Sequence, residues 1–165
     1  QDYLRQIMAQ AGMINADLSD QYWEPVRILV GENYYRALAA MQLYDVLLVN
    51  PIADGMNLVA KEGVLVNQRD GVLVLSEHAG VFYELGEHAL IVSPFDIHST
   101  AEALHQALTM PVEERHERAE AMRQQVRAND VSQWFYHQVD DALAALSSRA
   151  RKDSTPAMPG SSASA

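Results

Sequence analysis

A short polar segment, residues 50–57, carries the residue types best suited to bind a ligand. It follows a run of apolar residues and leads directly into a segment with helical patterning. A helix that starts there would leave unpaired backbone N–H groups and the positive end of its dipole at the segment. Asp54 supplies a carboxylate for ligand hydroxyls, and Gly55 lets a ligand approach the backbone. Residues 50–57 are therefore the first candidate site, suited to an anion such as a phosphate.

A second carboxylate, Glu62, follows Asp54 by eight residues and lies about two turns along the predicted helix. It could hold a second diol, such as that of a ribose. Another interpretation needs no ligand: Asp54 belongs to the helix cap, Gly55 makes a turn, and Lys61 and Glu62 lie on a solvated helix surface. The residue types alone leave both interpretations open.

The elements that must position these residues alternate between strands and helices. Buried strands are predicted at 26–30, 45–49, 72–75 and 89–92, each a short apolar run bounded by turn residues. Helices are predicted at 34–42, from about residue 57, and at 80–85. This alternation is typical of a parallel sheet with helices on both faces, joined by right-handed crossovers. The predicted fold class is α/β with a Rossmann-like sheet.

Ligands of open parallel sheets bind outside the carboxyl ends of the strands, so the loops after Val49, Leu75 and Val92 should line one crevice. His78 lies in the second of these loops, although most lone loop histidines touch no ligand. The neighbouring Ser76 is not part of a G-x-S-x-G nucleophile elbow, which argues against a hydrolase. The sequence identifies no catalytic residue.

Helical segments flank the alternating region. Residues 3–14 predict an amphipathic helix that buries one stripe, formed by Leu4, Ile7, Met8, Ala11 and Ile14. Beyond residue 96, Ser99 is predicted to cap a helix that runs to Leu108, Pro111 to begin the next, and 131–146 to form a third. One domain is predicted over residues 1–146. Residues 147–165 are rich in Ser, Ala, Pro and Gly and are predicted to be disordered.

Composition excludes several classes of function. With 12 basic against 22 acidic residues the net charge is -10, which repels nucleic acid, and the absence of cysteine excludes disulfides and thiolate zinc sites. No apolar run approaches membrane-spanning length and no signal peptide is apparent, so a soluble, cytoplasmic protein without a membrane partner is expected. Because the chain begins at Gln1 it is expected to be a fragment. The oligomeric state, a homo-oligomer included, stays open.

Histidines and aromatic residues offer weaker candidates. Four histidines lie on different predicted helices without ligand spacing, so solvated surface is favoured over a metal site: His98, His105, His116 and His137. Three aromatic residues are expected to be packing anchors rather than a sugar-stacking platform: Trp23, Trp134 and Phe135.

A longer pattern surrounds the candidate segment. The string Asp54-Gly-Met-Asn-Leu-Val-Ala-Lys-Glu62 follows Tyr44-Asp-Val-Leu-Leu-Val-Asn-Pro51 and precedes Gly71-Val-Leu-Val-Leu-Ser-Glu77. In this order, and with the later Ile91-Val-Ser-Pro-Phe-Asp96, these strings resemble the trehalose-6-phosphate synthase family. The resemblance spans about residues 22–146. It implies a GT-B glycosyltransferase, of which this chain resembles only the C-terminal, donor-binding part.

The resemblance also implies roles for individual residues. Asp54 would bond glucose hydroxyls, and Glu62 would hold the ribose diol. The backbone N–H groups near the sugar would be those of Gly55, Met56 and Asn57, and those offered to the distal phosphate would be those of Leu58 and Val59. The implied ligands are a nucleotide-sugar donor, UDP-glucose first among them, and a sugar-phosphate acceptor. No cofactor or metal is implied.

The implied reaction is retaining glucosyl transfer to glucose 6-phosphate, which forms trehalose 6-phosphate. Two alternatives stay open: a non-catalytic nucleotide-sugar-binding module, and a related synthase with another sugar-phosphate or a cyclitol acceptor. The chain departs from the family pattern at Ala53, where a basic residue is usual. It also lacks the acceptor domain and the Arg and Lys that grip the diphosphate, so this piece alone is expected to be inactive.

Overall fold

The computed structural model describes residues 2–129 and 131–153. The chain divides into two compact units, Gln1–Ala37 and Leu38–Ala165. Helix α2 (Tyr34–Leu43), predicted from the sequence, begins in the first unit and ends in the second. Within the described ranges, no helix is long and apolar enough to cross a membrane.

The first unit contains helix α1 (Asp2–Leu18) and an irregular segment that follows it. The prediction of a helix here is confirmed, but the prediction of a buried stripe is wrong. Of the five stripe residues only Ala11 is buried, and Met8 is 49% exposed. The helix has only the irregular segment to pack against within its own unit, so its apolar side chains stay in solvent.

The strand predicted at 26–30 is absent. Both backbone polar groups of Val26 bond to the side chain of Asn15 on α1, with its N–H donating to Oδ1 at 2.9 Å and its carbonyl accepting from Nδ2 at 2.8 Å. A strand needs a neighbouring strand to satisfy its backbone. Among the described residues no strand pairs with this run, and Asn15 satisfies the backbone of Val26 instead.

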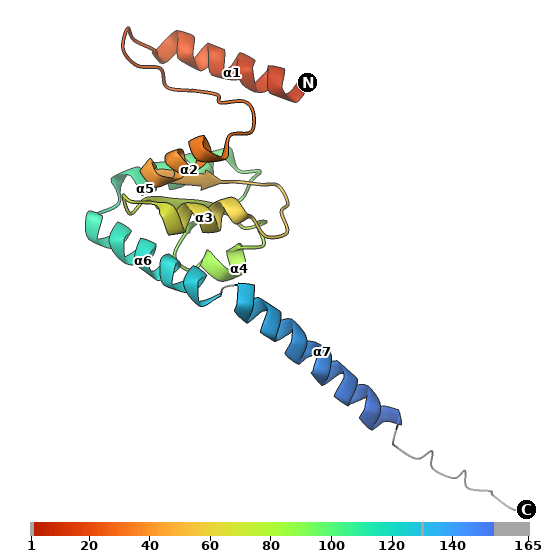
Figure 1. Cartoon of the computed structure of the whole chain (residues 1–165). Coiled ribbons are helices and arrows are strands. Elements are labelled where there is room, and N and C mark those ends of the chain that lie inside the picture. The colour runs from red at the N-terminus through yellow and green to blue at the C-terminus, as the bar shows by residue number, and fades with distance from the viewer. Residues whose placement is uncertain (1, 130, 154–165) are drawn as a thin grey trace, which may run out of the picture. The chain divides into compact units, whose positions relative to one another are not determined.

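The second unit is built on a three-stranded parallel sheet of order β1-β2-β3 (Figure 1). The strands are β1 (Val46–Val49), β2 (Val72–Ser76) and β3 (Leu90–Val92). Val46 pairs with Val72, and Val74 pairs with Leu90. The predicted parallel α/β fold is confirmed, with three of the four predicted strands.

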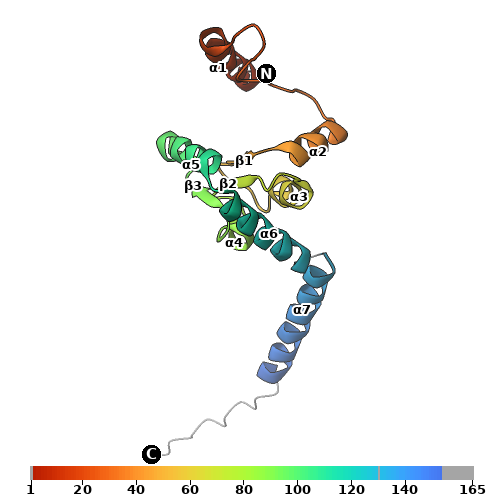
Figure 2. The same cartoon turned by 90° about the vertical axis from the view of Figure 1, so that its left-hand side faces the viewer.

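Helices cover both faces of this sheet (Figure 2). On one face lie α3 (Leu58–Val66), α4 (Phe82–Leu85) and α6 (Val112–Ala128), which pack against Leu73 and Leu75. On the other face α5 (Ile97–Thr109) packs against Val72 and Val74. Every residue of β2 is buried. The alternation of β2 side chains therefore divides the core into two layers, as expected for a sheet covered on both sides.

The C-terminal helices differ from the prediction in detail. Asp96, not Ser99, is the N-cap of α5: its side chain accepts from the backbone N–H of Ser99 at 3.0 Å. Pro111, predicted to begin the next helix, is the N-cap residue directly before α6. Helix α7 (Val131–Asp153) passes the predicted boundary at residue 146. Residues 154–165 lie outside the described part, and the disorder predicted there stays a prediction.

The aromatic residues expected to anchor packing are exposed instead. Trp134 is 59% exposed and Phe135 57%, and every described residue of α7 through Ser147 is exposed. Trp23, in the first unit, is also 59% exposed. Aromatic type alone favours burial, but burial also needs a facing surface, and the described part of the chain provides none at these positions.

Candidate functional site

Three loops meet at the carboxyl end of the sheet, as the sequence predicts. The backbone N–H of Glu77 donates to the carbonyl of Val92, the last residue of β3, at 3.0 Å, and the ring of His78 meets that of Phe95 in the loop after β3. Asp54 and Ala79 form an isolated parallel bridge, which joins the loops after β1 and β2. The loop that contains residues 50–57 is thus held beside residues 76–81.

A short ladder of backbone bonds fixes the loop around Asp54. The N–H of Asp54 donates to the carbonyl of His78 at 3.3 Å, and the N–H of Gly80 donates to the carbonyl of Asp54 at 2.9 Å. One step further, the N–H of Val81 donates to the carbonyl of Met56 at 2.9 Å. The loop therefore leads into α3 along a defined path.

The loops after β1 and β2 come very close together at Gly55 and Gly80. A Cβ atom on Gly80 would lie 2.0 Å from the carbonyl oxygen of Gly55, so no larger residue fits there without a backbone shift. A Cβ atom on Gly55 would meet nothing within 4 Å. The space beside Gly55 is therefore open, and a ligand can approach the backbone from that side.

Asn57 is the N-cap of α3, and Asp54 supports it. Asn57 has a left-handed φ of 73°, and its Oδ1 accepts from the N–H of Ala60 at 3.0 Å. Its Nδ2 donates to Oδ2 of Asp54 at 2.8 Å. The exposed Asp54 carboxylate also accepts from the N–H of Met56 at 3.3 Å, and its remaining lone pairs are available to a ligand.

The first turn of α3 presents free donors. The N–H groups of Leu58 and Val59 occupy the first two helical positions, which have no intrahelical acceptor. In the described part of the chain, neither N–H group has a protein acceptor. Both residues are about half exposed, at 58% and 45%. Free amides in the first turn of a helix, at the positive end of its dipole, can bind an anion.

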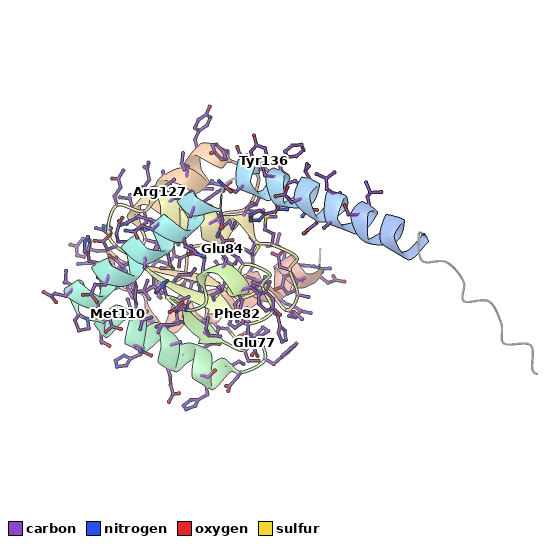
Figure 3. All side chains as sticks on the ribbon, turned by 90° about the horizontal axis from the view of Figure 1, so that it is seen from below. Glu77, Phe82, Glu84, Met110, Arg127 and Tyr136 are labelled. Atoms are coloured by element: carbon purple, nitrogen blue, oxygen red, sulfur yellow. The ribbon has the colours of Figure 1, made fainter. Side chains whose placement is uncertain are left out.

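The two charged residues of α3 have different surroundings. Glu62 is exposed, and no ion pair of Glu62 is found among the residues described. Lys61 pairs with Glu84 on α4 at 2.6 Å, and both side chains are less than 20% exposed. The interpretation of Lys61 as solvated surface is therefore wrong. Figure 3 labels Glu84 and Phe82 on the short α4 helix, which the ion pair joins to α3.

Ser76 and His78 both hold the backbone of this loop, a role that their sequence context does not predict. The hydroxyl of Ser76, which is fully buried, donates to the carbonyl of Pro51 at 2.8 Å. Nδ1 of His78 lies 2.9 Å from the carbonyl oxygen of Ile52. The partners are separated by about 25 positions along the chain, so only a pattern of conserved pairs could have revealed these contacts from sequence.

At the opposite end of the sheet, before β2 begins, Asp70 contacts two basic side chains of α6. Asp70 pairs with Nδ1 of His116 at 3.0 Å and with the guanidinium of Arg123 at 2.9 Å. The hydrogen bond from His116, together with Arg123, lowers the pKa of Asp70 despite its partial burial. His116 is thus exposed but paired. No cluster with a metal-ligand set occurs in the ranges that the structure describes.

Comparisons with known proteins identify the family of the chain. Residues 1–144 match glycosyltransferase family 20. The trehalose-6-phosphate synthase of Sinorhizobium fredii (strain NBRC 101917 / NGR234) is 43% identical over 143 residues, which make up 85% of this chain and 31% of that protein. The chain therefore spans about a third of the length of this relative.

Solved structures give the same result. A UDP-forming alpha,alpha-trehalose-phosphate synthase from Burkholderia xenovorans, in complex with glucose-6-phosphate, has a TM-score of 0.78 at 41% identity, covering 86% of this chain and 31% of that one. A structure from E. coli bound with UDP-2-fluoro glucose has a TM-score of 0.78 at 38% identity, covering 86% of this chain and 32% of that one. The predicted fold and the predicted resemblance are both confirmed.

Proposed function

We propose, because this chain belongs to glycosyltransferase family 20, that it is the donor-binding part of a retaining glycosyltransferase that makes trehalose 6-phosphate. Its donor is a nucleotide glucose, with UDP-glucose favoured, and the acceptor of the complete enzyme is glucose 6-phosphate. The bound ligands of the solved relatives support this choice: glucose-6-phosphate in one structure and UDP-2-fluoro glucose in another.

One observation carries the proposal: the start of α3 offers unpaired amides beside an open glycine. The N–H groups of Leu58 and Val59 would bind the distal phosphate of the donor. The amides of Gly55, Met56 and Asn57 would lie near the glucose, because the space beside Gly55 is free of protein.

The two carboxylates would fix the rest of the donor. Asp54 keeps acceptor capacity beyond its bonds to Met56 and Asn57, and glucose hydroxyls would use it. Glu62 is exposed and has no ion-pair partner among the described residues, so it is free to accept from the ribose diol. Carboxylates suit sugar hydroxyls because they accept several hydrogen bonds at once.

During transfer, the bond between glucose and the distal phosphate breaks and negative charge grows on that phosphate. Preorganised N–H donors stabilise this charge without reorganising, which lowers the barrier to departure. The amides and dipole of α3 would supply part of this stabilisation. In the proposed retaining reaction the acceptor hydroxyl attacks from the face that the nucleotide leaves, and its proton passes to the departing phosphate. The acceptor side is expected outside this chain, so donor binding rather than turnover is expected of it.

Isothermal titration calorimetry of the 165-residue chain tests the proposal. UDP-glucose, ADP-glucose and GDP-glucose are titrated into the chain and into Asp54→Ala and Glu62→Ala. One donor should bind selectively, and each substitution should weaken binding at least tenfold, because hydrogen bonds to a charged group are lost. Glu102→Ala removes an exposed carboxylate from α5 and should leave affinity unchanged.

The alternatives give different results in the same titrations. A synthase with another sugar-phosphate or a cyclitol acceptor would still bind a nucleotide sugar, and its acceptor would be identified with the complete enzyme. An inert module that has lost the site would bind none of the three donors. If Asp54→Ala and Glu62→Ala bind the donor as tightly as the unaltered chain, the assigned site is wrong.

A further inference from the structure

His78 makes a contact that the proposed donor site does not use directly. Its Nδ1 atom lies 2.9 Å from the carbonyl oxygen of Ile52. A carbonyl oxygen can only accept a hydrogen bond, so Nδ1 must carry a proton and donate it. The ring also meets Phe95 edge-on, with centroids 5.9 Å apart and planes at 63°. The imidazole is thereby oriented by two neighbours, one from each adjoining loop.

This bond completes a row of contacts along the candidate loop. Before Asp54, side chains hold two consecutive carbonyls: Ser76 holds that of Pro51, and His78 holds that of Ile52. From Asp54 onward, backbone N–H groups of the neighbouring loop donate to the loop carbonyls: Gly80 to that of Asp54, and Val81 to that of Met56. The His78 bond therefore spans the stretch between the buried Ser76 contact and the backbone ladder.

The Ile52 stretch has little else to hold it. Ile52 is 64% exposed, and Ala53 and Asp54 are also exposed, so hydrophobic burial does not fix their backbone. A loop held only at its two ends samples more conformations, and ordering it when a ligand binds costs free energy. A side-chain bond in the middle of the loop reduces that cost before the ligand arrives.

We propose that His78 is a positioning residue for the donor loop: its Nδ1–H holds the Ile52 carbonyl and so places Asp54 for the sugar. His78 acts through the loop backbone and needs no contact with the donor. The role of His78 in donor binding rests on the proposed function. The bond to Ile52 and its effect on the loop do not depend on that function.

Three substitutions distinguish the effect of the His78–Ile52 hydrogen bond from the effect of side-chain packing. The side-chain nitrogen of asparagine occupies about the position of Nδ1, whereas that of glutamine occupies about the position of Nε2. His78→Asn should therefore keep the bond to Ile52, and His78→Gln and His78→Ala should lose it. The side chain of His78 is 42% exposed, so none of the three opens a cavity in the core.

Backbone amide exchange, followed by NMR in the full chain without ligand, measures the effect on the loop. The reporters are the amides of Asp54, Gly80 and Val81, which bond across the two loops. Loss of one hydrogen bond should speed their exchange about threefold to tenfold in His78→Ala and His78→Gln. His78→Asn should exchange like the unaltered chain, and β2 amides should not change in any variant. Unchanged exchange in His78→Ala, or equally fast exchange in His78→Asn, would overturn the proposal.

UDP-glucose titration then tests the consequence for binding. Affinity should fall about threefold to tenfold in His78→Ala and His78→Gln and return in His78→Asn. Faster loop exchange with unchanged affinity would contradict a role in donor positioning. If the unaltered chain binds no UDP-glucose, the proposed function fails, while the exchange experiment still decides whether His78 orders the loop.

Discussion

Gly80 and Gly55 approach each other across two loops, and only Gly80 is crowded by protein atoms. Gly80→Ala would place its Cβ against the Gly55 carbonyl, so the two loops must separate. We expect a loss of about 1–3 kcal/mol in the free energy of unfolding, as for other overpacked sites. Urea denaturation measures this loss.

Gly55→Ala is the matched control for this prediction. Its Cβ meets nothing within 4 Å and its φ is not left-handed, so the free energy of unfolding should change little. Its affinity for UDP-glucose should nevertheless fall, because the methyl group occupies the space proposed for the sugar. Equal stability of the two variants would contradict the close contact at Gly80.

Asp70 makes stability depend on pH. Its pKa in the folded chain is lowered below the ordinary value of 3.8, first by the hydrogen bond from His116. The stabilisation is therefore complete above pH 3.8 and is lost as pH falls through the lowered folded pKa. Asp70→Asn should cost about 0.5–1 kcal/mol near neutral pH, the upper part of the range measured for ion pairs near the protein surface.

Urea denaturation of the unaltered chain and Asp70→Asn, from about pH 6 to about pH 2.5, checks this dependence. The two curves of unfolding free energy against pH should converge at the acidic end. A constant difference across the whole range would show that the carboxylate charge is not responsible.

The residues of the candidate loop could be selected from sequence because their types suit hydroxyls and phosphates. Their protein partners could not. Lys61 pairs with Glu84 and His78 bonds to Ile52, each over more than twenty positions, and no local pattern reports such contacts. Glu62 and Lys61 look equivalent in the sequence, and only packing separates the exposed Glu62 from Lys61 in a partly buried ion pair.

At the scale of elements, the start of α3 depends on Asn57. Its left-handed backbone and its bond to the N–H of Ala60 suit asparagine better than alanine. Asn57→Ala should lower the free energy of unfolding by about 1–2 kcal/mol, since it loses the cap and strains the backbone. Thermal or urea denaturation measures the change.

Asn57→Gly separates the two causes. Glycine tolerates a φ of 73° and is only slightly worse as an N-cap, so a loss of a few tenths of a kcal/mol is expected. If Asn57→Ala is as stable as the unaltered chain, the assigned cap does not stabilise α3.

Most helices and three strands could be predicted because each has its own pattern of apolar residues and turn residues. The strand at 26–30 could not be judged in this way. Its apolar composition is suitable, but Asn15 takes the backbone groups of Val26 that a strand would share with a neighbour. A strand forms only when a partner is present, and the sequence of the segment itself does not reveal the partner.

At the scale of the molecule, the chain spans about a third of the length of its relatives: it covers 31% of the Sinorhizobium synthase. Apolar residues predicted as buried are exposed on α1 and α7. The periodicity of these helices indicates which face is apolar but not which surface covers it. The second unit, in contrast, holds its own two-layered core and the complete start of α3.

The most direct test is a two-dimensional ¹H–¹⁵N NMR titration of the chain with UDP-glucose. The amides of Leu58 and Val59 should shift most, because they are proposed to bind the distal phosphate, and those of Gly55 and Met56 should also shift in a saturable way. Shifts confined to other elements such as α5 or α7, or no saturable shift at residues 55–59, would contradict a donor site at the start of α3.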